Sequence, residues 1–363
     1  MKILLICSTS NSVLTFRKTL IEEIQKKGHY VAAICFDSQN KAEIEERGVE
    51  FHCVEDDNRS TNPFKVLSLK KRLYRIIKKV LPDVVFTFMM KPNIFGTAAA
   101  KKAKIEKIYS MVEGAGDVFI RNGFKWKAIR TLVCSMYRKS FAYSQKVFFL
   151  NKDDRKEFLD RGLVKEKQCE IIPGIGVDLQ HFEYRPLENN NTFLMIARML
   201  TTKGIFEYCK AARKVKQSHP QAVFNYLGGE GTVKVADIQE FIDDGSINYL
   251  GTTKDVRPYL SECSVFVLPS YREGMPVSVM EAEAIGRAVI VADNPGIRES
   301  AKDGYNGFLI KNDNLVDGLS EKIIWFLENP EQIAVMGENS RSFAEERFDY
   351  KKINEKIIKT IGI

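Results

Sequence analysis

The stretch VFVLPSYREGMPVSVMEAEAIGRAVIVAD, residues 265–293, decides the fold of this 363-residue chain. It opens with the apolar run Val265–Leu268, which predicts a buried strand, because short runs rich in β-branched residues suit strands. A polar loop follows, a helix is expected to begin near Pro276, and Ala288–Val291 predicts a second buried strand. Two buried strands joined by a helix form a βαβ unit, so this stretch predicts a parallel sheet.

The same alternation of strands and helices continues in both directions along the chain. It is interrupted between residues 173 and 192, where turn-forming and polar residues predict a linker. The chain therefore predicts two Rossmann-like domains, 1–180 and 181–345, with ligands at the carboxyl ends of the strands, in a cleft between the domains. The predicted strands are Ile3–Cys7, Val31–Phe36, Val49–Val54, Val84–Phe88, Lys107–Val112, Lys146–Leu150, Cys169–Ile172, Phe193–Ala197, Ala222–Leu227, Ile247–Leu250, Val265–Leu268 and Ala288–Val291, and the predicted helices include Val13–Lys27, Phe64–Val80, Lys125–Ala142 and Tyr350–Ile361.

Composition excludes several classes of protein. With 44% apolar and 28% charged residues, the chain can bury a core, and wholesale disorder is excluded. No uncharged apolar run approaches the ~18 residues that a membrane span needs. Seven scattered cysteines and four histidines lack the spacing of a disulfide framework or a metal site, so free thiols, a reducing cytoplasm and no metal are expected. The net charge of +8 divides into +12 for residues 1–186 and −4 for 187–363, which predicts an anionic partner for the first half.

The loop and helix that follow the strand at 265–268 carry residues suited to a polar, partly anionic ligand. Glu273 and Glu281 lie eight positions apart, and carboxylates accept hydrogen bonds from sugar hydroxyls. Gly274 allows a ligand to approach the backbone closely, and the N–H groups near the helix start, those of Val277 and Ser278, favour an anion. A single carboxylate here would more often be a solvated charge at a helix end, but the combination favours a ligand-binding loop.

Other predicted strands end in further candidates. Arg198 and, five residues later, Lys203 follow one strand, where cations would neutralise a diphosphate. Gly228 and Leu250 lie at the ends of two more predicted strands, and Leu250 is followed by Gly251. A glycine turn at a strand end either admits a nucleoside close to the backbone or simply joins the strand to a helix. Glu113 also follows a strand, either as a ligand-binding group or as a helix cap.

Residues 273–281, EGMPVSVME, resemble the E-x7-E motif of retaining glycosyltransferases of family four, which have the GT-B fold. Arg198 and Lys203 resemble that family's diphosphate-binding pair, and PGIGVDLQHF at 173–182 resembles its inter-domain turn. The resemblance implies a nucleotide sugar held by the second domain, an acceptor held by the first and no metal or other cofactor. It also implies that the C-terminal helix, residues 346–363, crosses back to complete the first domain.

The resemblance assigns roles to the candidate residues as well. Glu273 is expected to hold the donor hexose and Glu281 the ribose, while Arg198 and Lys203 stabilise the leaving diphosphate. Glu113 stands where many members of the family carry a histidine, and it is expected to act in catalysis. The remaining donor contacts are expected from Gly274, Met275, Val277, Ser278, Gly228 and Leu250. The chain departs from the family once more at 10–12, where Ser-Asn-Ser replaces a common Gly-Gly turn.

The segments 112–114 and 266–293, together with Phe16-Arg17, resemble the subgroup that extends undecaprenyl-diphosphate-linked sugars. This resemblance implies transfer of a hexose or N-acetylhexosamine, with N-acetylgalactosamine favoured, from a UDP-sugar to an undecaprenyl-diphosphate-linked saccharide, as in bacterial N-glycosylation. The alternatives are a family-four enzyme of O-antigen or capsule synthesis that uses another UDP-hexose, and a GT-B enzyme with a soluble acceptor. A non-catalytic module that binds a membrane or nucleic acid is a third.

Two basic stretches bear on where the protein acts. Arg59–Lys79 and Val118–Lys152 each contain eight Lys or Arg, and aromatic residues lie among them. Basic helices with aromatic residues suit an anionic membrane surface, although such helices are often only solvated faces over a buried stripe. We expect a peripheral protein on the cytoplasmic face of the membrane. No nucleic-acid recognition motif is present, so nucleic acid is not an expected partner.

Overall fold

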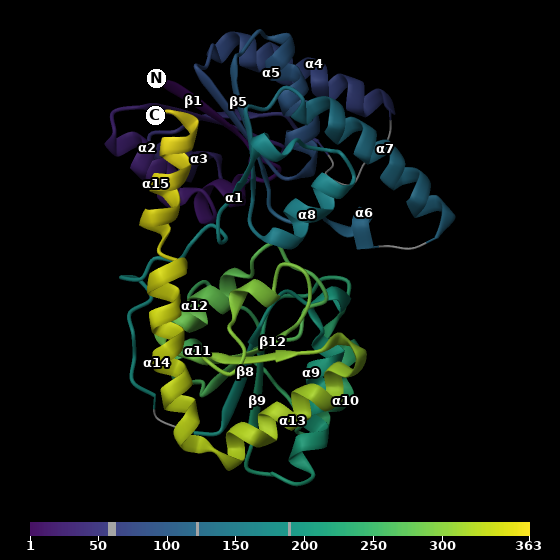
Figure 1. The fold of residues 1–363 in the computed structure, drawn as a ribbon, viewed down its shortest axis with the longest axis vertical. Helices are drawn as coiled ribbons and strands as arrows, with labels where there is room; N and C mark the ends of the chain where they lie inside the picture. The colour runs from purple at the N-terminus through teal and green to yellow at the C-terminus, as the bar shows by residue number, and fades with distance from the viewer. Residues whose placement is uncertain (57–62, 121–122, 188–189) are drawn as a thin grey trace. The chain divides into compact units, whose positions relative to one another are not determined.

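The computed structural model describes residues 1–56, 63–120, 123–187 and 190–363, and side chains are described for all of these except 63–67, 117 and 120. The chain forms two compact units, Met1–Ile175 with Lys351–Ile363, and Gly176–Tyr350 (Figure 1). Each unit contains a parallel sheet flanked by helices.

The first unit contains a seven-stranded parallel sheet in the order β3-β2-β1-β4-β5-β6-β7. Among its central strands, β4 is buried along its whole length and β5 at every residue after the first, because helices cover both faces of a parallel sheet. In the register, Ile3 of β1 lies between Val31 of β2 and Val84 of β4. The strands are β1 (Lys2–Ile6), β2 (Tyr30–Cys35), β3 (Glu50–Cys53), β4 (Val84–Phe88), β5 (Lys107–Val112), β6 (Lys146–Phe149) and β7 (Cys169–Ile171).

Helices of the first unit follow most of its strands. The predicted single helix at Val13–Lys27 is wrong: the structure divides it into α1 and α2, with Phe16 and Arg17 between them. The N–H groups of both residues donate to the carbonyl of Ser12, which ends α1 and turns the chain inward. The helices are α1 (Ser10–Thr15), α2 (Lys18–Lys26), α3 (Lys41–Glu46), α4 (Pro63–Val80), α5 (Thr97–Lys102), α6 (Asp117–Ile120), α7 (Phe124–Phe141), α8 (Lys152–Asp160) and α15 (Tyr350–Ile361), with short helical turns at η1 (Pro92–Gly96) and η2 (Glu166–Gln168).

The C-terminal helix α15 packs mainly in the first unit, as the sequence predicted. Its apolar residues recur at helical spacing, and Ile353, Ile357 and Ile361 are buried. Asn354 Nδ2 donates a hydrogen bond of 3.1 Å to Thr19 Oγ1 on α2. The last segment of the chain therefore completes the core of a unit formed otherwise by residues 1–175.

The second unit contains a six-stranded parallel sheet in the order β10-β9-β8-β11-β12-β13. The predicted strands are present, and β13 is an additional edge strand that the sequence did not reveal. The strands are β8 (Thr192–Ile196), β9 (Val223–Leu227), β10 (Asn248–Tyr249), β11 (Val265–Leu268), β12 (Ala288–Ala292) and β13 (Gly307–Ile310). The helices are α9 (Ile205–Lys216), α10 (Gln239–Asp243), α11 (Arg257–Glu262), α12 (Val277–Ile285), α13 (Leu315–Glu328) and α14 (Pro330–Arg347), with short helical turns at η3 (Thr201–Lys203), η4 (Val235–Ile238), η5 (Arg298–Ser300) and η6 (Asn312–Asn314).

Two segments at the edge of the second unit run side by side, next to the points where the chain passes between the units. The N–H of Val177 donates to the carbonyl of Phe348 at 2.7 Å, and the N–H of Tyr350 donates to the carbonyl of Val177 at 3.3 Å. Gly176 has a φ of +81°, and a Cβ there would lie 2.5 Å from Cα of Tyr350. The close pairing of the two segments therefore requires glycine at this position.

In the described part of the chain, no helix is both long and apolar enough to cross a bilayer.

Candidate active site

The strand order of the second sheet reverses between β8 and β11, and the predicted site residues gather there. In open α/β sheets, ligands bind at the carboxyl ends of the strands beside such a reversal. Lys203 lies in η3 after β8, and Glu273 lies in the loop after β11. Lys203 Nζ and Glu273 Oε1 form an ion pair at 2.5 Å, with 25% and 11% of the side chains exposed. Two residues that the sequence placed 70 positions apart thus form one partly exposed pair.

Hydrogen bonds between the turn η3, which carries Lys203, and the loop after β11, which carries Glu273, fix this ion pair. Ser270 Oγ donates to the carbonyl of Thr202 at 3.0 Å, and the N–H of Tyr271 donates to the same oxygen at 2.9 Å. The N–H of Glu273 donates to the carbonyl of Pro295 at 3.1 Å. Gly296, with a φ of +82°, packs against the backbone of Glu273, and a Cβ at this position would be 1.8 Å from the carbonyl oxygen of Glu273. The backbone around Glu273 is therefore held from two sides.

Helix α12 begins directly after this loop, with Pro276 as its N-cap residue. The first N–H groups of a helix have no acceptor within the helix, so those of Val277 and Ser278 are directed out of its start. Both residues are half-buried, whereas Gly274 and Met275 just before them are buried. The helix start combines a partial positive charge with donors aimed beyond it, which is the arrangement that binds phosphate groups.

Two carboxyl groups in α12 are held in unusual surroundings. Glu281 is half-buried, and burial raises the pKa of its carboxyl to about 8. Glu283 is fully buried, and burial raises its pKa well above the ordinary value. Its Oε1 accepts a hydrogen bond of 2.6 Å from Asn306 Nδ2, which joins α12 to the segment before β13. Glu283 could not be recognised from the sequence, because a carboxylate in an apolar helix gives no local signal of a distant hydrogen-bond partner such as Asn306.

The other predicted donor residues are placed as follows. Arg198 is exposed after β8, and among the described residues its guanidinium contacts no acceptor, so the structure does not bring it to Glu273. Gly228 packs so closely that a Cβ would lie 1.7 Å from the carbonyl oxygen of Ala197. The N–H of Leu250 donates to the carbonyl of Tyr226 at 2.9 Å. Backbone packing alone thus accounts for glycine at 228, whether or not a nucleoside contacts it.

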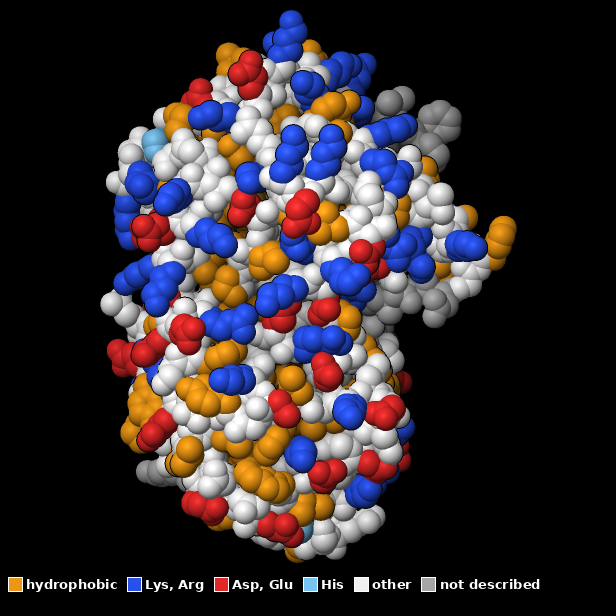
Figure 2. Space-filling view, viewed as in Figure 1, with side chains coloured by type: hydrophobic (Ala, Val, Ile, Leu, Met, Phe, Trp, Pro, Cys, Tyr) orange, Lys and Arg blue, Asp and Glu red, His pale blue; other side chains and the backbone are white. Residues whose placement is uncertain are grey.

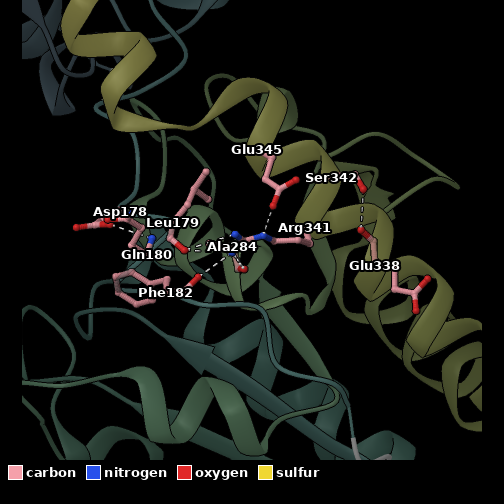
Figure 3. A network of polar contacts seen from close by, with 9 residues as sticks. All are labelled: Asp178, Leu179, Gln180, Phe182, Ala284, Glu338, Arg341, Ser342 and Glu345. Carbon is pink, nitrogen blue, oxygen red and sulfur yellow. Dashed lines mark hydrogen bonds and ion pairs between the residues drawn. The ribbon is translucent and has the colours of Figure 1, made fainter.

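The turn at 173–182 is held to α12 by a residue that the sequence did not indicate. Arg341 of α14 donates from Nη1 to the carbonyls of Phe182 at 2.9 Å and Ala284 at 2.7 Å, and more weakly to that of Leu179 at 3.4 Å (Figure 3). Its Nε donates to Glu345 Oε1 at 2.6 Å. Since Ala284 lies in the last turn of α12, this one guanidinium joins three segments of the second unit. No motif surrounds Arg341, so no sequence pattern could have found it.

In the first unit, Glu113 lies just after β5 and pairs with Arg17 from the break between α1 and α2. Lys91 Nζ, after β4, pairs with Asp56 Oδ2 at 2.7 Å. The structure therefore brings Glu113 and Arg17 together, although no sequence pattern indicated that these two residues are in contact.

Solved structures share this architecture over nearly the whole chain. HepE of Anabaena, in complex with UDP, aligns over 99% of both chains with a TM-score of 0.81 at 17% identity. Sucrose-phosphate synthase of Thermosynechococcus elongatus aligns over 99% of this chain and 98% of its own, with a TM-score of 0.82 at 14% identity. Two units with parallel sheets and this likeness define the GT-B fold of glycosyltransferases, which confirms the predicted fold class.

Sequence relatives give the family. The family description "Glycosyl transferases group 1" matches residues 177–343, and "Glycosyl transferase 4-like" matches residues 2–151. The N,N'-diacetylbacillosaminyl-diphospho-undecaprenol alpha-1,3-N-acetylgalactosaminyltransferase of Campylobacter jejuni is 31% identical over 96% of this chain and 97% of its own. The UDP-Gal:alpha-D-GlcNAc-diphosphoundecaprenol alpha-1,3-galactosyltransferase of Escherichia coli is 25% identical over 78% and 76%. The chain belongs to the GT4 family of glycosyltransferases.

Proposed function

We propose that the protein transfers N-acetylgalactosamine, or another hexose or N-acetylhexosamine, from a UDP-sugar to an undecaprenyl-diphosphate-linked saccharide, with retention of configuration. The observation that carries this proposal is the near full-length similarity to the C. jejuni enzyme, whose name specifies this sugar and a diphospho-undecaprenol acceptor. The E. coli relative, named for UDP-galactose and a diphosphoundecaprenol acceptor, supports the same class of donor and acceptor.

The geometry of the second unit supports a role in stabilising the leaving diphosphate. As the bond to the sugar breaks, negative charge develops on the departing UDP. Lys203, which is positioned by its ion pair with Glu273, and the N-terminus of α12 would stabilise that charge, and neither would need to change position during the reaction. Arg198, exposed after the same strand as Lys203, would add a second cation. Glu273 would bind the transferred sugar and Glu281 the ribose, since a carboxyl group at each position can bind hydroxyls.

We propose that no metal is needed for this step, because Lys203, Arg198 and the helix start supply the positive charge that a metal supplies elsewhere. The proton of the acceptor hydroxyl would pass to the departing phosphate oxygen, so that the new glycosidic bond forms as the bond to UDP breaks on the same face.

We also propose that the first unit attaches peripherally to the cytoplasmic face of the membrane. Many Lys and Arg side chains lie on the face of this unit shown in Figure 2. In α7, Phe124 is 90% exposed and Leu132 is 62% exposed, with Lys125 and Lys127 exposed beside them. Exposed apolar side chains among lysines suit an interface of anionic lipid, at about 1 kcal/mol per cation near the surface. The part of the predicted basic stretches at 59–62 and 121–122 lies outside the described residues.

The proposal is tested by UDP release from a panel of UDP-hexoses and UDP-N-acetylhexosamines, with and without a bacterial polyprenyl-diphosphate glycan fraction, in the presence of EDTA. Release with one donor that depends on the lipid fraction and persists in EDTA is expected. Release with soluble acceptors alone would instead support a soluble-acceptor GT-B enzyme, and no release with any donor would refute the proposal.

Membrane attachment is tested separately by sedimentation with anionic vesicles. Replacing Phe124 and Leu132 by Ser is expected to weaken sedimentation, whereas Ser at Val335, an exposed apolar residue of α14, serves as the matched control. Equal sedimentation of all three proteins would contradict attachment through α7.

A further inference from the structure

The buried arginine of the first unit and its partner form an arrangement that the fold alone does not require. Arg17 lies at the break between α1 and α2, with only 2% of its side chain exposed, and its guanidinium pairs with Oε1 of Glu113. The guanidinium carbon lies 4.1 Å from the centre of the Phe88 ring, and Nη1 donates to the carbonyl of Phe16 at 3.1 Å. In contrast to Arg17, 17% of the Glu113 side chain is exposed.

These groups lie where the first sheet offers a binding site. The strand order reverses between β1 and β4, and β5 is the next strand beyond β4. Cys7 follows β1, Phe88 ends β4 and Glu113 follows β5, so all three lie at the carboxyl edge of neighbouring strands. Ligands of open α/β sheets bind outside this edge, beside the reversal. The exposed part of Glu113 therefore lies at the expected ligand position of the first unit.

The charges indicate which member of the pair acts on a ligand. Burial lowers the pKa of Arg17 to about 10, so the guanidinium stays charged at neutral pH. A buried charge is strongly destabilising without a counter-charge, and Glu113 provides one. The thiol of Cys7 does not, because burial raises its pKa to about 11 and keeps it neutral. Arg17 and Glu113 thus compensate each other's charge, and the ion pair fixes the direction of the carboxylate.

The exposed member of the pair is the Glu113 carboxylate, and the charge of the buried Arg17 guanidinium is already neutralised by it. A phosphate group would be repelled by such a surface, whereas a carboxylate accepts hydrogen bonds from hydroxyl groups. We propose that Glu113 binds a hydroxyl of a neutral sugar in the first unit and that Arg17 is the positioning residue that holds it for this purpose. This inference rests on the proposed function, in which the sugar is either the transferred hexose or the sugar of the acceptor.

The test compares Glu113→Gln, Arg17→Gln, Arg17→Lys and the double variant Arg17→Gln/Glu113→Gln in steady-state kinetics. Glu113→Gln is expected to lower kcat/KM at least tenfold, the loss associated with one charged hydrogen bond. Arg17→Gln is expected to give a similar loss, which Arg17→Lys partly restores. The double variant is expected to resemble Glu113→Gln alone, because both single changes remove the same positioned carboxylate.

Two measurements separate the sources of the sugar and exclude a merely structural role. A raised KM for the lipid-linked acceptor, with donor hydrolysis in the absence of acceptor unchanged, identifies the acceptor sugar. A changed KM for the UDP-sugar, with altered hydrolysis, identifies the transferred hexose. In Arg17→Gln the loss is expected in the same KM as in Glu113→Gln, with partial recovery in Arg17→Lys, whereas a loss of folding would lower the apparent kcat and leave both KM values unchanged.

Arg161→Gln is the matched control, because Arg161 pairs with Glu157 at 2.9 Å and lies over the ring of Phe119 after the last residue of α8. Its kinetics are expected to change less than twofold. The inference is overturned if folded Glu113→Gln keeps kcat and both KM values within twofold, or if the losses from Arg17→Gln and Glu113→Gln are additive. Wild-type turnover with soluble acceptors alone would refute the proposed lipid-linked acceptor, and the roles of Arg17 and Glu113 would then be tested by the same kinetics with the soluble acceptor. No turnover with any acceptor would refute both the proposed function and this inference.

Discussion

Glu281→Gln is expected to change the way the second unit's stability depends on pH. Burial raises the pKa of the Glu281 carboxyl from the ordinary 4.5 to about 8. Between these pH values the folded protein retains a proton that the unfolded chain has released. The free energy of unfolding therefore falls as the pH rises through this window, by up to about 1.4 kcal/mol per unit. Because the side chain is only half-buried, solvent reduces the total from about 5 to about 2 kcal/mol.

Glutamine has nearly the same shape and stays neutral, so the variant lacks this pH-dependent contribution. We expect the variant to gain about 2 kcal/mol on the wild type between pH 5 and pH 8. The assay is urea unfolding at pH 5, 6, 7 and 8, followed by the fluorescence of Trp325, which packs against Phe308 and Phe326 in the second unit. Glu283, whose pKa is also raised by burial, is present in both proteins and affects both curves alike.

Parallel curves for the two proteins would refute this reasoning, since they would mean that Glu281 is ionised equally in the folded and unfolded chain. A variant that loses stability relative to the wild type as the pH rises would show that the pKa of Glu281 is lowered on folding, not raised. Trp126 in the first unit contributes the same background to both proteins, so a difference between the curves reports the substitution.

Three further predictions concern the second unit. Lys203→Ala is expected to lower kcat at least about 100-fold, the loss typical of removing one group that stabilises transition-state charge, while the unfolding midpoint changes little. Gly296→Ala places a Cβ 1.8 Å from the carbonyl oxygen of Glu273 and is expected to cost more than about 2 kcal/mol in urea unfolding, whereas Gly304→Ala, with a φ of +69° and open space around it, is expected to cost about 1 kcal/mol. Arg341→Ala removes the donor to three backbone carbonyls and is expected to lower the melting temperature by several degrees, with Arg341→Lys in between; equal melting temperatures would contradict its bracing role.

Much of the fold was predictable from local pattern, because each buried strand of a parallel sheet is a short apolar run and each covering helix has an apolar stripe. Strand β13 was missed because its conformation depends on a neighbour. It begins at Gly307, where a Cβ would lie 1.8 Å from the carbonyl oxygen of Val289 on β12. The incorrect prediction of a single helix at Val13–Lys27 has the same origin, since Arg17, at the break between the two helices, is buried and pairs with Glu113 on a distant segment.

The candidate site was predictable in part for a related reason. Lys203 and Glu273 were found because both follow buried strands, and the carboxyl ends of parallel strands meet at one edge of a sheet. Their direct ion pair depends on β8 and β11 being neighbours, which the sequence order alone does not fix. Arg341 could not be found at all, because its acceptors are backbone carbonyls, and a carbonyl carries no residue-specific signal.

Each sheet carries a cation–carboxylate pair near the carboxyl ends of its strands, and the two pairs differ in which member is the more exposed. In the second unit Lys203 is the more exposed member, at 25% against 11% for Glu273, so that site offers a cation to its ligand. In the first unit Glu113 is the more exposed member, at 17% against 2% for Arg17, so that site offers an anion. A diphosphate suits the first arrangement and a neutral sugar hydroxyl the second. Part of the positive charge of residues 1–186 lies on helices such as α7, where exposed lysines are available for an anionic surface.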